Sequence, residues 1–283
     1  MSTISAADVK ALRDRTGMQM MKCKAALIEA QGDMEKAVEL LRKQNKEAQD
    51  KAATRETAEG RIAVFIDPAR KLGAIIEVRC ESAPVAKNEL FLQLANDLAR
   101  QVALQNPATV EDLLRQPFVD NPKKTVNERV GDVVGLIREN MKPARFTRLA
   151  GQLGSYIHHD GSIGVLLQVE GANPDPQLLS DICMHITATS PRAARREDLP
   201  AELVEKEKEI ARSQVMADPK NQKKPANILD KIIEGKLKAW AAENVLVEQP
   251  FVKDDSKTVG DVLKAAGLKL VKYVRYRVGE VGA

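Results

Sequence analysis

The chain has 283 residues, of which 43% are hydrophobic, so it is long enough for about two or three domains that each bury a core. Its 44 Lys and Arg residues against 40 Asp and Glu residues give a formal net charge of only +4, and aromatic residues make up 3%. A dedicated nucleic-acid binder more often combines a one-sided basic surface with aromatic side chains for stacking. The composition therefore argues against nucleic acid as a partner.

Cysteine usage and apolar patterning bear on the compartment. The 3 cysteines, Cys23, Cys80 and Cys183, are odd in number and far apart, which argues against a disulfide framework and favours a reducing environment. The first residues contain no apolar run typical of a signal peptide, and no stretch reaches the length of a membrane span. We therefore expect a cytoplasmic protein with no membrane partner.

Residues 4–44 predict three short helices. Ser5 and Asp8 have the spacing of a capping box, and Gly17 is a helix-ending signal. A second apolar stripe recurs at helical spacing, and it consists of Met20, Cys23, Leu27 and Ala30. We place a small helical domain at 1–45.

The segment that follows this domain is polar. Residues 43–60 contain no large apolar side chain, which is typical of a linker or of a solvated helix. We assign 46–60 as a linker, and we expect it to leave the helical domain free to dock separately on a partner.

The rest of the chain contains an internal repeat. A Gln-Pro-Phe-Val sequence occurs at Gln116–Val119 and again at Gln249–Val252, and Lys-Thr-Val follows both copies. Two further pairs of segments keep the same order: Leu72–Val78 with Ile163–Val169, and Asp97–Val102 with Asp181–Ile186. Each copy predicts a β-hairpin, a helix, the Gln-Pro-Phe loop, a helix and a strand. We place the two related α+β halves at 61–150 and 151–283.

The second copy carries an insertion at about 198–246 that the first copy lacks. Its first part is rich in Glu, Lys and Ala, and Asp218-Pro219 and Lys224-Pro225 then interrupt the pattern. Apolar residues resume at helical spacing after the second proline. The insertion therefore predicts an antiparallel helical hairpin around a polar turn.

These features together resemble the elongation factor Ts family over nearly the whole chain. The motifs that carry the resemblance are Val9–Gly17, Met20–Leu27, Gly32-Asp33, Cys80–Asn88, Gly154–His158, Met184–Ile186, Gln249–Phe251 and Arg275–Glu280. The resemblance implies an α+β fold with a ubiquitin-associated-like helical domain, two duplicated α+β half-domains and a coiled-coil protrusion. The repeat and the inserted hairpin follow from the residues alone.

The resemblance also implies a function. Members of the family bind elongation factor Tu in its GDP-bound and nucleotide-free states and promote the exchange of GDP for GTP. Such a factor needs no catalytic residue, metal or cofactor of its own, and the sequence contains no Gly-rich phosphate-binding motif, so we expect no enzyme activity. The family's partner-binding positions correspond here to Val9, Leu12, Arg13, Met20, Met21 and His185.

One loop departs from the family pattern. The family's magnesium-dislocation loop usually reads Thr-Asp-Phe-Val, but here it reads Ser82, Ala83, Pro84 and Val85. Pro84 fixes its own φ and biases Ala83 toward extended backbone, so we expect a stiff loop that stays at the partner interface. The alternative is an elongation factor Tu-binding or chaperone-like relative with weak exchange activity.

Residue chemistry alone leaves other interpretations open. Neighbouring helical residues point about 100° apart, so Met20 and Met21 cannot both fill one small core. His185 lies on an apolar helix face, where a histidine is more often a hydrogen-bonded core residue than a contact. We expect the Gln-Pro-Phe loops to be structural, each seating a Phe. A metal site at His158-His159-Asp160 is disfavoured, because neighbours on a strand point to opposite faces and the third ligand lies at the turn. A nucleophilic Cys80 is disfavoured, because no Cys–His pair has a supporting third group.

Overall fold

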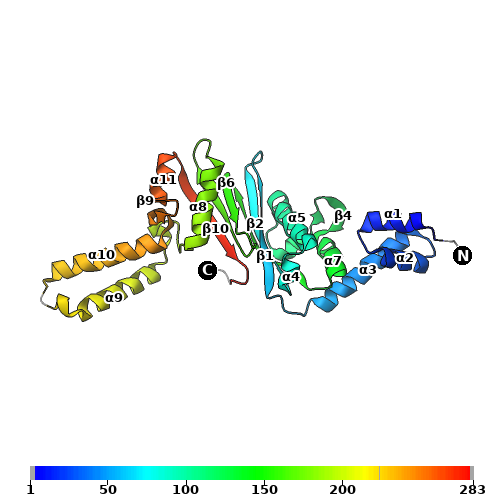
Figure 1. Ribbon diagram of the computed structural model, residues 1–283, viewed down its shortest axis with the longest axis horizontal. Coiled ribbons are helices and arrows are strands. Elements are labelled where there is room, and N and C mark those ends of the chain that lie inside the picture. Colours follow the sequence, from blue (N-terminus) through cyan, green and yellow to red (C-terminus); the bar gives the residue numbers. More distant parts are fainter. Residues whose placement is uncertain (1–3, 223, 281–283) are drawn as a thin grey trace. The chain divides into compact units, whose positions relative to one another are not determined.

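A computed structural model describes residues 4–222 and 224–280 (Figure 1). Helices and small sheets alternate along the chain, so the fold belongs to the mixed α+β class. The chain divides into two compact units. The first unit contains the chain up to Leu149, together with His159–Gly164 and the segment from Tyr276 onward, and the second contains Ala150–His158 and Val165–Arg275. No helix among the described residues is long and apolar enough to cross a membrane.

The first unit begins with three helices, α1 Ala6–Thr16, α2 Met20–Glu29 and α3 Met34–Ala52. Ser5 and Asp8 cap α1 reciprocally, because the Ser5 hydroxyl accepts from the Asp8 amide and the Asp8 carboxylate from the Ser5 amide, both at 3.1 Å. Gly17 ends α1 at φ 71°, a left-handed conformation that glycine adopts without strain. The helices bury a core made of Val9, Leu12, Met18, Cys23, Ala26, Leu27, Ala30, Ala37, Val38 and Leu41.

The first unit continues with a sheet of order β1-β2-β5. Its strands are β1 Glu59–Asp67, β2 Leu72–Cys80 and β5 Met141–Ala150. β1 and β2 form an antiparallel hairpin whose register runs from Glu59 opposite Cys80 to Asp67 opposite Leu72. Between β2 and β5 the chain forms α4 Ala83–Ala86, α5 Glu89–Gln105, α6 Val110–Arg115, β3 Pro117–Phe118, β4 Asn121–Thr125 and α7 Val126–Ile137.

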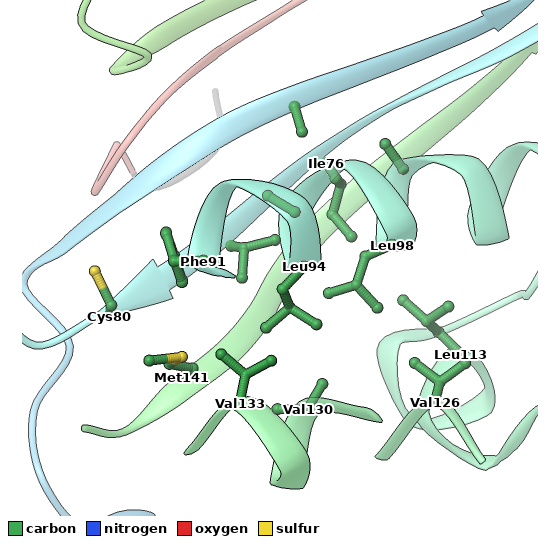
Figure 2. Packing of buried hydrophobic residues seen from close by; sticks show 14 of the residues in the cluster. Ile76, Cys80, Phe91, Leu94, Leu98, Leu113, Val126, Val130, Val133 and Met141 are labelled. Atoms are coloured by element: carbon green, nitrogen blue, oxygen red, sulfur yellow. The ribbon is translucent and has the colours of Figure 1, made fainter. Parts of the chain in front are cut away.

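Helices α5 and α7 pack with this sheet around the main core of the first unit. Figure 2 shows Phe91, Leu94 and Leu98 of α5 together with Val133 of α7 and Met141 of β5. All five side chains are at most 2% exposed. Burying an apolar side chain of this size contributes roughly 1.5–3 kcal/mol, so these contacts fix both helices on the sheet.

Helix α3 runs past the end of the expected helical domain. Residues 46–52, which the polar composition assigned to a linker, belong to α3, and Ala52 at its end is buried in the core of the β1-β2-β5 half. The segment without helix or strand is limited to 53–58. The expected linker over 46–60 is therefore corrected to this shorter connection.

Polar side chains hold the end of α3 against α7. Nδ2 of Asn45 donates to Oδ1 of Asp132 at 3.1 Å. Gly131 and Gly135 of α7 leave room for α3, because a Cβ on Gly135 would lie 2.2 Å from Oδ1 of Asn45 and one on Gly131 would lie 2.9 Å from Oε1 of Gln49. Residues that look solvated in the sequence are thus packed against a second helix.

The second unit repeats this order of elements. β6 Gln152–Ile157, β7 Ile163–Glu170 and β10 Lys269–Arg277 form a sheet of order β10-β7-β6. Its last strand therefore pairs with the second of two consecutive strands, as β5 pairs with β2. The elements between β7 and β10 that correspond to α5, β3, β4 and α7 are α8 Pro176–Thr189, β8 Pro250–Phe251, β9 Asp254–Thr258 and α11 Val259–Ala265.

Two long helices, α9 Ala201–Ala217 and α10 Ala226–Asn244, stand where the first unit has only α6 (Figure 1). They run in opposite directions and bury Ala211, Val215 and Ile233 between them. At the tip, Nδ2 of Asn221 donates to the carbonyl oxygen of Val215 at 2.9 Å, and its Oδ1 accepts from Lys224 at 2.8 Å. Side-chain bonds therefore close the turn. Short 3₁₀ turns occur at Arg196–Asp198, Pro219–Asn221 and Leu246–Glu248.

The last described residues return to the sheet of the first unit. Glu77 of β2 is 2% exposed, and its carboxylate accepts from Nε of Arg145 at 2.7 Å and from the Gly279 amide at 2.9 Å. Nη2 of Arg145 donates to the carbonyl oxygen of Arg277 at 2.9 Å, and its guanidinium lies 4.3 Å from the ring centroid of Tyr276. The C-terminal segment thus supplies part of the surroundings of a buried carboxylate.

Candidate functional site

Two methionines are exposed at the start of α2. Met20 is 50% and Met21 73% exposed, and neither belongs to the core of the helical domain. Arg13 on α1 is also exposed. Val9 and Leu12 are instead 7% and 0% exposed and lie inside that core. Of the five positions, Arg13, Met20 and Met21 are therefore available for contact, and Val9 and Leu12 hold the helices together.

The turn before α2 explains why both methionines lie on the surface. Met18 is 1% exposed and fills the core, where Nδ2 of Asn45 lies 3.6 Å from its sulfur. Cys23 and Leu27 form the inward face of α2. Because Met18 already occupies the interior, the buried stripe begins at Cys23 and not at Met20 as the spacing suggested.

One further large apolar residue of α2 is exposed, and the sequence did not single it out. Ile28 is 58% exposed, and Ala25 is exposed as well. Met21, Ala25 and Ile28 share a helix face, since spacings of four and three residues bring side chains onto one side. The spacing is readable in the sequence, but only the burial of the neighbouring Leu27 shows that Ile28 faces outward.

The segment expected to form the magnesium-dislocation loop is the single helical turn α4. Ala83 and Pro84 are exposed, whereas Val85 is 8% exposed. Proline fits the first turn of a helix, because its missing amide hydrogen has no partner there. Ala83 is helical, so the expected extended backbone is corrected. The Ala86 amide donates to the Ser82 carbonyl oxygen at 3.1 Å and closes the turn, and this bond overrides the preference of a residue before proline for extended backbone.

Two glutamates anchor this turn. The Ser82 amide donates to Glu139 at 3.1 Å, and the Ser82 hydroxyl donates to the other oxygen of the same carboxylate at 2.6 Å. Glu81 accepts from the amide of Asn140 and pairs with Arg55 at 3.2 Å. The anchoring role of Glu139 has no signal in the sequence, because Ser82 and Glu139 are distant along the chain.

The thiol of Cys80 lies next to the turn but is not reactive. Its Sγ is 3.4 Å from the carbonyl oxygen of Ser82. Burial, followed by the nearby charge of Glu139, raises the pKa of this thiol to about 12. Burial raises the pKa of the Cys183 thiol as well. Since the thiolate is the nucleophilic form, both cysteines stay protonated and unreactive near neutral pH.

His185 is a core residue of the second unit and is 0% exposed. Its Nδ1 accepts from the Val252 amide at 3.3 Å, which leaves Nε2 to donate to Oε1 of Gln249 at 2.9 Å. Burial lowers the pKa of this imidazole, and the bond to Gln249 opposes that effect to a smaller extent. The expected direct contact with a partner is corrected, because a neutral ring bonded at both nitrogens has no exposed atom to offer.

Gln101 occupies the corresponding position on α5 of the first unit. It is 0% exposed, its Nε2 donates to Oε1 of Gln116 at 3.2 Å, and its Oε1 accepts from the Val119 amide at 2.8 Å. In each half, a buried polar side chain therefore bonds to both ends of the Gln-Pro-Phe-Val loop. Phe118 and Phe251 are each 6% exposed, as expected of structural loops.

The same two helices carry corresponding carboxylates. Oδ1 of Asp97 accepts from Gln93 at 2.7 Å, and Oδ1 of Asp181 accepts from Gln177 at 2.8 Å. The Lys253 ammonium group, 2.8 Å from Asp181, holds the pKa of that carboxyl below its usual range. These carboxylates are ion-paired or hydrogen-bonded parts of the scaffold, and the lowered pKa of Asp181 is the opposite of what a general base at neutral pH needs.

Across residues 4–222 and 224–280, no group of three or more His, Cys, Asp or Glu side chains is arranged to hold a metal ion. At the positions that the sequence singled out, the exposed apolar residues are Met20 and Met21 on α2 and Ala83 and Pro84 on α4, and Ile28 is exposed beside the methionines.

Known proteins resemble this chain along nearly its full length. Residues 81–280 match the family model described as elongation factor TS. The elongation factor Ts of Thioalkalivibrio sulfidiphilus is 43% identical over 282 residues, and that of Methylococcus capsulatus is 42% identical over 281, each covering 98% of this chain and 93% of the relative. The elongation factor Ts of Aquifex aeolicus is 40% identical over 288 residues, which cover 98% of both chains.

An α+β chain that matches these proteins over 98% of its length is a translation elongation factor. The chain belongs to the elongation factor Ts family. The resemblance indicated by the sequence motifs is thereby confirmed.

Proposed function

We propose that this chain binds elongation factor Tu and promotes the release of GDP from it, so that GTP can enter. Membership of the elongation factor Ts family is the observation that carries the proposal. Exposed apolar side chains on α2 that take no part in the core support a protein as the partner. The proposal includes a cytoplasmic location, no nucleic-acid or membrane partner, no cofactor and no enzymatic activity.

An exchange factor acts by differential binding. It must bind the nucleotide-free partner more tightly than the GDP-bound partner, and by linkage GDP then weakens its binding by the same factor. GDP is held by backbone amides around its phosphates and by Mg²⁺. A contact that displaces either of these weakens the nucleotide, so no residue of the factor has to enter a chemical step.

Within the helical domain, we assign the partner contacts to Arg13, Met20 and Met21. Methionine suits such a surface because its unbranched side chain adapts to a partner's shape. Val9 and Leu12 then act indirectly, by packing the helices that carry the contacts. His185 also acts indirectly, by holding the loop that contains Val252.

The finer architecture is part of the same proposal. We infer that the two α+β halves arose by duplication, that α1–α3 form a ubiquitin-associated-like domain, and that α9 and α10 form an inserted coiled coil. The shared strand order supports the duplication. The equivalent hydrogen bonds of Gln101 and His185 support it independently.

The composition of α4 favours a second candidate function. Ala83 and Pro84 supply neither the charge nor the large ring that the family usually has at these positions. In this second candidate, the chain binds elongation factor Tu, or acts on it as a chaperone-like protein, with weak exchange activity. In the leading proposal, the turn anchored by Glu81 and Glu139 acts as a rigid wedge.

Stopped-flow release of labelled GDP from elongation factor Tu of the same organism separates the two candidates. The leading proposal expects this chain to accelerate release. Tight binding without acceleration would support the second candidate, and absence of binding would reject both. Ala83→Gly/Pro84→Gly loosens the turn and should slow the stimulated release, whereas an unchanged rate would remove α4 from the mechanism. Ala83→Asp/Pro84→Phe tests whether the usual family residues increase the rate.

A further inference from the structure

Three methionines lie within one short stretch of the helical domain and differ widely in exposure. Met18 is 1% exposed, Met20 50% and Met21 73%. The sulfur of Met18 lies in the core beside the Asn45 side chain, at 3.6 Å from its Nδ2. Met20 and Met21 lie outside that core. A diffusing oxidant therefore has access to the second and third thioethers but not to the first.

We propose that Met20 and Met21 form an oxidation-sensitive contact site, at which hydrogen peroxide converts methionine to the sulfoxide and weakens binding to elongation factor Tu. The inference rests on the proposed function, because it concerns the regulation of the same patch. In the chemical step, the thioether sulfur attacks one peroxide oxygen, an S–O bond forms and the O–O bond breaks. The sulfur is oxidised by two electrons, and the second oxygen leaves as water with both peroxide protons.

Oxidation at this site leaves the fold intact. A sulfoxide at Met20 or Met21 disturbs no buried contact, and water bonds to its oxygen. The core that holds the bundle is buried, with Leu12 and Leu27 0% exposed, and its sulfur-bearing members Met18 and Cys23 are only 1% and 0% exposed. Oxidation of Met18 would instead place an unpaired polar oxygen in the core. Because Met20 and Met21 are exposed and Met18 is buried, oxidation of the exposed pair lowers binding without lowering stability.

The same modification is unfavourable in a bound complex. A methionine sulfoxide is polar, and an apolar contact surface offers no donor to its oxygen. Burying an unpaired polar group costs enough free energy to lower affinity by about tenfold or more. Arg13, which we assign to the same contact surface, has no sulfur, so its contact survives and binding is weakened without being abolished. Because sulfoxide reductases reverse the reaction, the loss is reversible.

The test treats the full chain with hydrogen peroxide, removes the peroxide with catalase and maps the products by peptide mass spectrometry. Met20 and Met21 should be oxidised before Met18 and before Met141, which is 2% exposed. Affinity for elongation factor Tu should fall by about tenfold or more, while the thermal unfolding midpoint changes little. Methionine sulfoxide reductase should restore the affinity.

Two variants make the result specific to the patch. Met20→Leu/Met21→Leu has no oxidisable sulfur there, so its affinity, whatever its starting value, should not fall further after peroxide. Met216→Leu removes a methionine of α9 that is 56% exposed, and its affinity should still fall. The inference is overturned if the double variant loses affinity as the natural chain does, or if oxidation of the patch leaves affinity unchanged. Failure of the untreated chain to bind would instead refute the proposed function.

Discussion

Leu12 and Arg13 are neighbours in α1, but one is buried and the other exposed. Leu12→Ala should lower the free energy of unfolding by about 2–5 kcal/mol, because it leaves a cavity in a small core. Arg13→Ala should change that energy by less than about 0.5 kcal/mol and should lower the affinity for elongation factor Tu. Urea unfolding and titration with the partner measure the two effects. Similar losses of stability in both variants would contradict the separation between core and contact residues.

The neutral ring of His185 predicts a dependence of stability on pH. Burial lowers the pKa of the folded state below the ordinary value of 6.5, so the unfolded chain binds the proton more readily. Stability therefore decreases as pH falls between the two pKa values. The stability that the neutral His185 ring contributes is fully present above about pH 6.5 and is lost as the pH falls toward the folded-state pKa.

Glutamine supplies the matched control for this prediction, because Gln101 makes equivalent bonds in the first unit without a titrating group. His185→Gln should remove the histidine's part of the pH dependence. His185→Ala should lower stability at every pH by about 1–3 kcal/mol, since it leaves buried groups unpaired. Chemical unfolding between about pH 5 and 8 measures both. If the natural chain and His185→Gln follow the same pH curve, His185 does not gain a proton on unfolding.

Residue chemistry predicted the surroundings of His185 better than the family resemblance did. A histidine on an apolar helix face is usually a bonded core residue, and its partner Gln249 belongs to a motif that the repeat had already identified. Exposure was harder to predict for Met20, because it depends on Met18 turning inward before α2 begins. Met18 lies in the three-residue turn between α1 and α2, and the spacing of apolar residues does not predict which side chains of such a turn point inward.

Helix α3 shows why an element can be misjudged from composition. Its last two turns contain no large apolar residue, so polarity predicted solvent, yet they pack on α7 because Gly131 and Gly135 let polar side chains approach. The partners lie far apart in the sequence, and nothing local links them. The repeat and the inserted hairpin were predictable for the opposite reason, since their motifs and turn signals are contained within short segments.

Gly135→Ala tests the packing of α3 on α7. The added Cβ would lie 2.2 Å from Oδ1 of Asn45, so either the Asn45 side chain or the helices must shift, at a cost of about 1–3 kcal/mol. Asn45→Ala removes the clashing atom. The stability lost in the double variant Gly135→Ala/Asn45→Ala should therefore be smaller than the sum of the losses in the two single variants. Hydrogen exchange of the α3 amides measures the effect. Simple additivity would show that the two residues are not in contact.

At the scale of the whole molecule, the buried carboxylate of Glu77 ties the C-terminal segment to the first unit. Removing one partner of a buried ion pair costs up to about 3–5 kcal/mol, and the loss in Arg145→Ala should be smaller because Arg79 remains 3.9 Å from the same carboxylate. Glu77→Ala should be more destabilised than Arg145→Ala, because it leaves both Arg79 and Arg145 without their carboxylate. Thermal unfolding compares the two variants, and an Arg145→Ala chain that is the less stable of the two would contradict this account.

The return of the chain to Glu77 also concerns the order of synthesis. Domains usually fold as they emerge from the ribosome, beginning at the N-terminus, but the first unit obtains its bonds from Gly279 and Arg277 only after the intervening second unit has been made. We therefore expect its sheet to gain full protease resistance only after Gly279 has left the ribosome. Chains tethered to the ribosome through an added linker after Arg275 should be cut within β1 and β2 faster than chains tethered through the same linker after Glu280. Equal resistance would mean that β1 and β2 complete their folding without the segment that follows Arg275.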